Sequence, residues 1–166
     1  MQDLHRAGGL LRGCVAIDCG RGVAGWIGRR LARRLGIPAD RSDCGLLVRI
    51  AHAENALLWC RRFETGSEMV SAFVPYGHFP DGGWLEHTGP LTLDLGVDTT
   101  DGGWRWRLRR ARWHGLPVPL ALLPHSQAGK QVIDGRYAFA VEFRLPLLGR
   151  VLHYAGTLDA ETGSAD

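Results

Sequence analysis

Arg61 is the residue whose type and position most clearly suggest a chemical role. It follows Leu57 and Trp59 and precedes Phe63 at two-residue spacing, so on a β-strand these four side chains share one face. A guanidinium on an apolar face is costly unless a carboxylate, phosphate or carbonyl answers it, and the neighbouring runs offer no obvious acidic residue of inward parity. We expect Arg61 either to reach water at a strand end or to bind the acidic head of an amphipathic ligand.

Arg110 is the second arginine that alternation places on an apolar face. It belongs to the stretch GGWRWRLRRARW, in which one face of the expected strand carries Trp104, Trp106 and Leu108. The opposite face carries Arg105, Arg107 and Arg109, which we expect in solvent. A nucleic-acid platform would need tryptophan and arginine on the same surface, so the alternation argues against a nucleic acid as partner. Arg110 is therefore the alternative anchor for an acidic ligand head.

Residues for catalysis or metal binding form no recognisable pattern. The seven histidines and four cysteines lack the spacing of a metal site, and no nucleophile, zinc-protease or phosphate-loop motif occurs. Glu86 and His87 are adjacent, so on a strand they point to opposite faces, and we expect a solvated glutamate beside a packed histidine. We predict no catalytic residue, no metal and no cofactor. The cysteines are expected to be free, mostly buried thiols of a reducing compartment.

These candidates need one helix and a series of strands to position them. In Val23–Leu35 the apolar residues recur at helical spacing and gather on one face: Val23, Ala24, Ile27, Leu31 and Leu35. Gly36 and Pro38 are expected to end this helix. The stretch LLRGCVAIDC before it predicts a strand, and short alternating runs separated by turn residues follow it. We count about nine strands, taking Trp84–His87 to continue past Pro90 into Leu91–Asp98.

A sheet of this size with one apolar face must curl, because a flat sheet would leave that face in water. The sequence therefore predicts a mostly β (α+β) fold, an antiparallel meander curled into a barrel or half-barrel with one amphipathic helix after the first strand. Small cup-like lipid-binding barrels have the same order of elements. We expect these residues to line a ligand site: Arg61, Arg110, Trp59, Trp104, Trp106, Tyr137, Phe139, Phe143 and Tyr154.

The helix offers a second surface. Its polar face places Trp26 among arginines, of which Arg29 and Arg33 are the nearest candidates for contact with a membrane surface. The alternative is an ordinary amphipathic helix packed over the barrel, with Trp26 stacked on an arginine. Both interpretations remain open at this stage.

Composition limits the class of protein. The 166 residues fit one domain, which we place at 1–158, with 159–166 as a flexible tail. The net charge of +3 is too small for a dedicated polyanion-binding protein. No apolar run reaches the ~20 residues of a membrane-spanning helix, and the N-terminus lacks the pattern of a secretory signal. We expect a cytoplasmic protein.

Several segments resemble a family of bacterial domains of unknown function, DUF4166. They are the strand start Gly89–Leu91, the turns Gly115–Pro119 and Leu145–Gly149, and the ending Tyr154–Gly156, with the opening LRGCVAIDCGRG and the arginine-rich helix upstream. The resemblance implies a domain found alone or behind a saccharopine-dehydrogenase-like reductase domain, and it implies no catalytic residues. The chain itself lacks the glycine-rich dinucleotide fingerprint in a βαβ context.

These observations predict a non-enzymatic binding module for an apolar or amphipathic small molecule, accessory to a reductase partner. An enzyme that uses the barrel interior is the first alternative, and a structural interaction domain for an oxidoreductase is the second. Inward acid and base residues would favour the enzyme, and a filled interior would favour the structural domain.

Overall fold

The computed structural model describes residues 7–78, 81–88, 90–98, 104–120, 123 and 125–161, and for 104 and 125–131 it describes the backbone alone. Within these residues the chain forms an 11-stranded antiparallel sheet and one main helix. The elements are β1 (Gly9–Cys19), α2 (Gly22–Leu35), β2 (Asp43–Ala53), β3 (Ala56–Phe63), β4 (Glu68–Tyr76), β5 (Gly83–Thr88), β6 (Leu91–Asp98), β7 (Trp104–Trp113), β8 (Leu116–Val118), β9 (His125–Ile133), β10 (Arg136–Leu145) and β11 (Gly149–Glu161).

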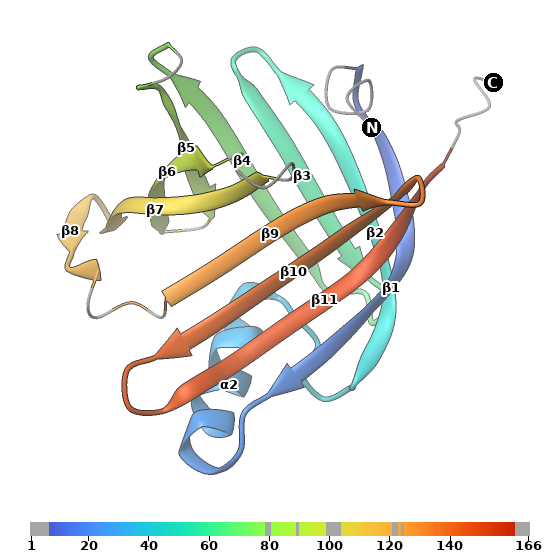
Figure 1. The fold of residues 1–166 in the computed structure, drawn as a ribbon, viewed down its shortest axis with the longest axis vertical. Coiled ribbons are helices and arrows are strands. Elements are labelled where there is room, and N and C mark those ends of the chain that lie inside the picture. Colours follow the sequence, from blue (N-terminus) through green and yellow to red (C-terminus); the bar gives the residue numbers. More distant parts are fainter. Residues whose placement is uncertain are drawn as a thin grey trace.

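The sheet is a meander that curls around a core. Its order is β6-β5-β4-β3-β2-β1-β11-β10-β9-β7-β8, and β6 pairs in addition with β7. The β7–β9 ladder consists of two residue pairs, Trp104 with Lys130 and Arg105 with Gly129, so these strands hold together over a short stretch only. The result is a curled half-barrel with one helix after the first strand, as predicted (Figure 1).

Two details of the strand count were wrong. Trp84–His87 and Leu91–Asp98 are separate strands of a hairpin, because the chain reverses between the paired residues Thr88 and Leu91. Pro90 lies in this turn, where the missing N–H costs nothing. The short strand β8, which the sequence suggested as a turn, pairs with the end of β7.

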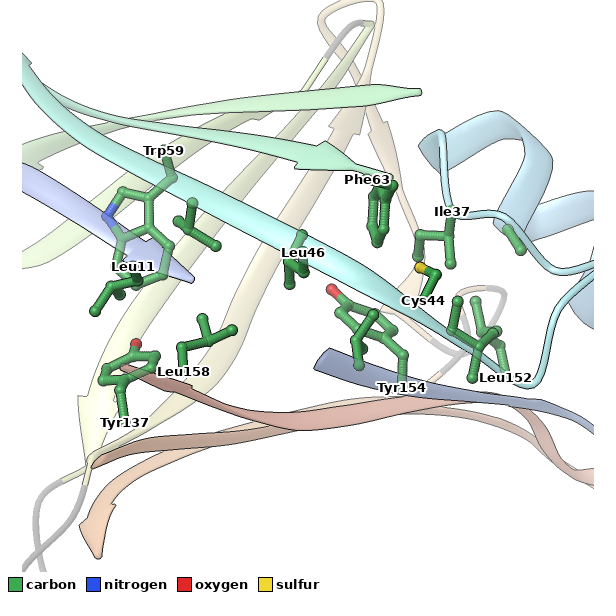
Figure 2. Packing of buried hydrophobic residues seen from close by; sticks show 14 of the residues in the cluster. Leu11, Ile37, Cys44, Leu46, Trp59, Phe63, Tyr137, Leu152, Tyr154 and Leu158 are labelled. Atoms are coloured by element: carbon green, nitrogen blue, oxygen red, sulfur yellow. The ribbon is translucent and has the colours of Figure 1, made fainter. Parts of the chain in front are cut away.

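The core lies between the two arms of the curl. Figure 2 shows side chains of β1, β2 and β3 facing those of β10 and β11, with Trp59, Leu11 and Tyr137 at one end. Phe63, Ile37, Cys44 and Leu152 lie at the other end, next to α2. The helix thus covers one end of the core.

Small residues bring α2 against the sheet. Its buried positions are Ala24, Gly25, Gly28 and Ala32, and a Cβ on Gly28 would lie only 1.8 Å from the carbonyl oxygen of Val151. Val23, predicted on the apolar face, is 64% exposed, because the face that packs is centred on the small residues. The helix ends where predicted: Gly36 has a φ of 73° and caps the last turn.

The four cysteines are free, but the prediction that most are buried was wrong. Cys44 is buried, Cys19 and Cys60 are half-buried, and Cys14 is exposed. In the part of the chain that the structure describes, no helix has the length and apolar character needed to cross a bilayer.

Candidate ligand-binding site

Arg61 faces the interior of the half-barrel, as the alternation predicts. In the β2–β3 ladder it pairs with Val48, which is 2% exposed, and its neighbours of the same face, Trp59 and Phe63, are buried. The side chain of Arg61 is itself half-buried. The cation therefore lies within the row of residues that builds the core.

The contacts of Arg61 are with neutral groups. Its Nη1 donates a hydrogen bond to the hydroxyl of Ser71 at 3.1 Å, and its guanidinium carbon lies 5.4 Å from the centre of the Trp59 ring. Ser71, on the adjacent strand β4, is 1% exposed. A cation above an aromatic face is stabilised by the ring quadrupole, more so when it is removed from water.

A polar chain continues from Ser71 to a carboxylate. The hydroxyl oxygens of Ser71 and Thr88 are 3.1 Å apart, and Thr88 donates to Glu86 Oε1 at 3.3 Å. With Thr88 donating to Glu86, the Ser71 hydroxyl donates to Thr88 and accepts from Arg61. We call Arg61, Ser71, Thr88 and Glu86 the polar chain; it joins a cation to an anion through two hydroxyls.

Glu86 corrects two expectations. It pairs with the buried Phe73 in the β4–β5 ladder and is half-buried, so an acidic residue of inward parity does exist near Arg61. His87 is exposed, and its Nδ1 lies 3.2 Å from the hydroxyl of Thr92, so the expected solvated glutamate and packed histidine are reversed. The signal was the alternation of Trp84, Glu86 and Thr88, which could have placed Glu86 on the face of the tryptophan.

Arg110 does not reach the interior. The β6–β7 ladder pairs Asp94 with Arg110 and then Leu95 with Leu108, so a bulge at Arg109 reverses the alternation. Arg110 is consequently exposed, and Ala111 takes the buried position. The prediction that Arg110 lies on the apolar face was wrong.

Aromatic residues lie beside the polar chain, with Trp59 at Arg61 and Phe73 opposite Glu86 in the β4–β5 ladder. Trp59 lies 6.1 Å from Phe73 and 6.2 Å from Tyr137, measured between ring centres, and Phe73 stacks on Trp106 at 5.5 Å. The remaining ring pairs are Trp84 with Trp106 and Phe139 with Tyr154. Ring contacts thus join three predicted lining residues, Trp59, Trp106 and Tyr137, through Trp59 and Phe73. Phe139 and Tyr154 form a separate pair.

The other predicted aromatic residues have different outcomes. Phe143 packs against the edge of the core, and the side chain of Trp104 lies outside the described residues. The sequence interpretation did not assign Phe73 and Trp84 to the ligand site, although Phe73 alternates with the apolar residues of its strand.

The positive charge of Arg61 influences the pKa values of both core tyrosines. Burial raises the pKa of Tyr137 and of Tyr154, and the positive charge of Arg61 partly offsets this effect in each case. The carboxylate of Glu86 adds to the rise in the pKa of Tyr154. Both phenols therefore stay protonated near neutral pH and can act as hydrogen-bond donors.

Burial inside the half-barrel is uneven. Inward residues of β1, β2 and β11 such as Val15, Val48 and Leu158 are almost fully buried. In contrast, many inward residues of β5, β6, β7 and β10 remain partly exposed, although Leu95, Ala111 and Tyr137 on these strands are buried. The partly exposed ones are Trp84, Glu86, Leu93, Trp106, Leu108, Phe139, Val141 and Phe143. Glu86, where the polar chain ends, is among these partly exposed residues.

The outer face of α2 is a separate surface. Trp26, Arg29 and Arg33 are all exposed, and the arginine that lies over the Trp26 ring is Arg30, at 6.0 Å. The helix packs on the sheet through its opposite face. Among the described residues, no group of three or more histidine, cysteine, aspartate or glutamate side chains could hold a metal ion.

Comparison with known families shows a match over most of the chain. The model of a family described as a domain of unknown function (DUF4166) matches residues 1–158 of the chain, a span that includes α2, the polar chain and most of β11. A search of curated proteins finds no match.

Proposed function

The chain belongs to the DUF4166 family, and from that premise we propose that it is a non-enzymatic binding module for an amphipathic small molecule with an acidic head group. The observation that carries the proposal is the inward Arg61, whose direct hydrogen-bond partner is a neutral hydroxyl rather than a carboxylate. A guanidinium has five N–H donors in a planar fork. A carboxylate or phosphate head could therefore bind it in a bidentate manner.

The surroundings of Arg61 suit an apolar tail. Trp106, Phe139 and Phe143 are inward and partly exposed, so a hydrocarbon chain placed over them would remove apolar surface from water. The buried phenols of Tyr137 and Tyr154 supply further neutral donors in the same interior. Ligand sites of small molecules commonly combine such apolar walls with a few converging polar groups.

Glu86 favours the enzyme alternative to a limited degree. It is an inward carboxylate joined to Arg61 through two hydroxyls, which provides one candidate acid or base in the interior. A reaction would need a second group aimed at the same substrate atom. The binding module therefore remains our proposal. The family resemblance implies a reductase domain as its partner, to which the module would be accessory.

We also propose a location in the bacterial cytoplasm. The support is the presence of four free cysteines, which suit a reducing compartment.

Purification of the native protein followed by mass spectrometry under non-denaturing conditions would reveal a retained amphiphile.

The decisive experiment replaces Arg61 by leucine. Arg61→Leu removes the head-group contact and keeps the wall apolar, so affinity for a long-chain fatty acid should fall by ~1.5–3 kcal/mol, the range for a hydrogen bond to a charged group. Affinity for the matching uncharged alcohol should fall much less. Titration calorimetry with both ligands measures the difference.

Arg107→Leu is the matched control, because Arg107 lies on the exposed face of β7. It should bind both ligands as the wild type does. Equal losses for acid and alcohol in Arg61→Leu, or no binding of either by the wild type, would end the proposal and favour the structural-domain alternative.

A further inference from the structure

The solvent face of α2 presents a tryptophan surrounded by arginines. Trp26 is 60% exposed and lies about 160° around an ideal helix from Gly28, the residue in contact with β11. It therefore occupies the outermost position of the helix. Four exposed arginines flank it on both sides: Arg29, Arg30, Arg33 and Arg34.

The turn between β10 and β11 adds two exposed leucines near this helix. Leu147 is fully exposed and Leu148 is 40% exposed. The φ of Leu147 is 66°, in the left-handed region that leucine rarely adopts, so a strained apolar side chain is held in water. Packing within the domain does not explain this choice of residue.

The helix and the turn lie at the same end of the half-barrel. Gly28 contacts the carbonyl of Val151, and the N–H of Gly20 donates to the same oxygen, two residues after the turn ends at Gly149. Figure 1 shows α2 and the β10–β11 turn together at the lower end of the molecule. Their exposed apolar side chains can therefore belong to one surface.

Helix α2 and its flanking residues give this end of the half-barrel a positive charge. From Cys19 to Ala39 the sequence has five arginines and no acidic residue. Two carboxylates of the adjoining strands β1 and β10 are already paired: Asp18 with Arg150, and Glu142 with Arg144. Within the described structure, none of the four α2 arginines forms an ion pair with a carboxylate.

We propose that this end of the half-barrel docks on an anionic lipid surface. Trp26, Leu147 and Leu148 enter the interfacial layer, and the α2 arginines bind lipid phosphates. Trp26 and Leu147 project outward from the fold, so a protein partner would need a matching pocket for each, whereas the interfacial layer accepts both. The proposal is independent of any ligand in the interior.

Vesicle flotation tests the electrostatic part. The wild type should bind vesicles of phosphatidylcholine mixed with phosphatidylglycerol, should bind pure phosphatidylcholine weakly, and should lose binding as salt is added. Neutralising two arginines in Arg29→Gln with Arg33→Gln should lower the partition coefficient roughly thirtyfold. The control, Arg107→Gln with Arg112→Gln on the outer face of β7, should have a far smaller effect.

Leu147→Asn tests the apolar part and separates it from folding. Asparagine tolerates the left-handed conformation, so this variant should be as stable as the wild type or more stable, yet should bind anionic vesicles less tightly. Trp26→Ala should weaken binding, and its control Trp113→Ala should not. Absence of binding to anionic vesicles, as expected for a surface that recognises a protein, would overturn the proposal. Unchanged binding by the arginine variant or by Leu147→Asn would do the same.

Discussion

The phenols of Tyr137 and Tyr154 make the folded state sensitive to alkaline pH. Burial raises the pKa of each above its value in the unfolded chain. Their contribution to stability is therefore complete below about pH 10, the ordinary value for tyrosine, and is lost as the pH rises above it.

An absorbance titration checks this expectation. Of the three tyrosines in the chain, Tyr137 and Tyr154 should ionise only together with unfolding, which circular dichroism would report at the same pH. Tyr137→Phe with Tyr154→Phe should remove the part of the alkaline transition that depends on these groups. Ionisation of all three phenols in a protein that is still folded would contradict the burial of the two core tyrosines.

At the same scale, Arg61 shows what the sequence could predict and why. Its inward position depends only on alternation along β3 with Trp59 and Phe63, and that strand has no bulge in its ladders. The prediction for Arg110 failed because the bulge at Arg109 depends on the pairing of β7 with β6. The alternation of residues along β7 alone carries no information on that pairing. Inward position is predictable from one strand only when its pairing is regular.

Helix α2 is the element whose packing depends most on residue size. Gly28→Ala would normally stabilise a helix by about 1 kcal/mol. Here the added methyl group would overlap the Val151 carbonyl oxygen, so the helix must move and the free energy of unfolding should fall by ~1–3 kcal/mol. Urea unfolding measures the change.

Val23→Ala provides the control on the same helix, because Val23 is largely exposed. Its effect on the free energy of unfolding should stay within about 0.5 kcal/mol. A gain of stability in Gly28→Ala would mean that α2 does not approach β11 as closely as described.

The elements also show the limits of sequence interpretation. The start and end of α2 were predicted closely, because helical spacing and Gly36 are local signals. Most of the apolar face predicted for α2 does pack: Ala24 is buried, and Ile27, Leu31 and Leu35 lie against the core. Val23 is exposed instead, and the buried Gly28 and Ala32 were not predicted because close approach, not hydrophobicity, selects them. The inward position of Glu86 was not predicted, because β5 is short and carries apolar and polar residues on both faces.

At the scale of the whole molecule, the β7–β9 ladder should be the least stable part of the sheet. It has two residue pairs, whereas β1 and β11 are paired continuously from Leu10 with Glu161 to Cys19 with Leu152. Amides in short ladders exchange with solvent through local openings that cost little free energy. Hydrogen exchange followed by mass spectrometry should show faster deuterium uptake in a β9 peptide than in a β1 peptide. Equal protection of both would contradict the short ladder.

The short β7–β9 ladder would also affect the kinetics of the ligand that we propose for the interior. If separation of these two strands is the step that admits and releases it, the rate of exchange is set by how often they part. The observed association rate would then approach a constant value as the ligand concentration rises, even though α2 and the rest of the sheet stay in place. Residence time would be a property of this one ladder, separate from the affinity that we propose for Arg61.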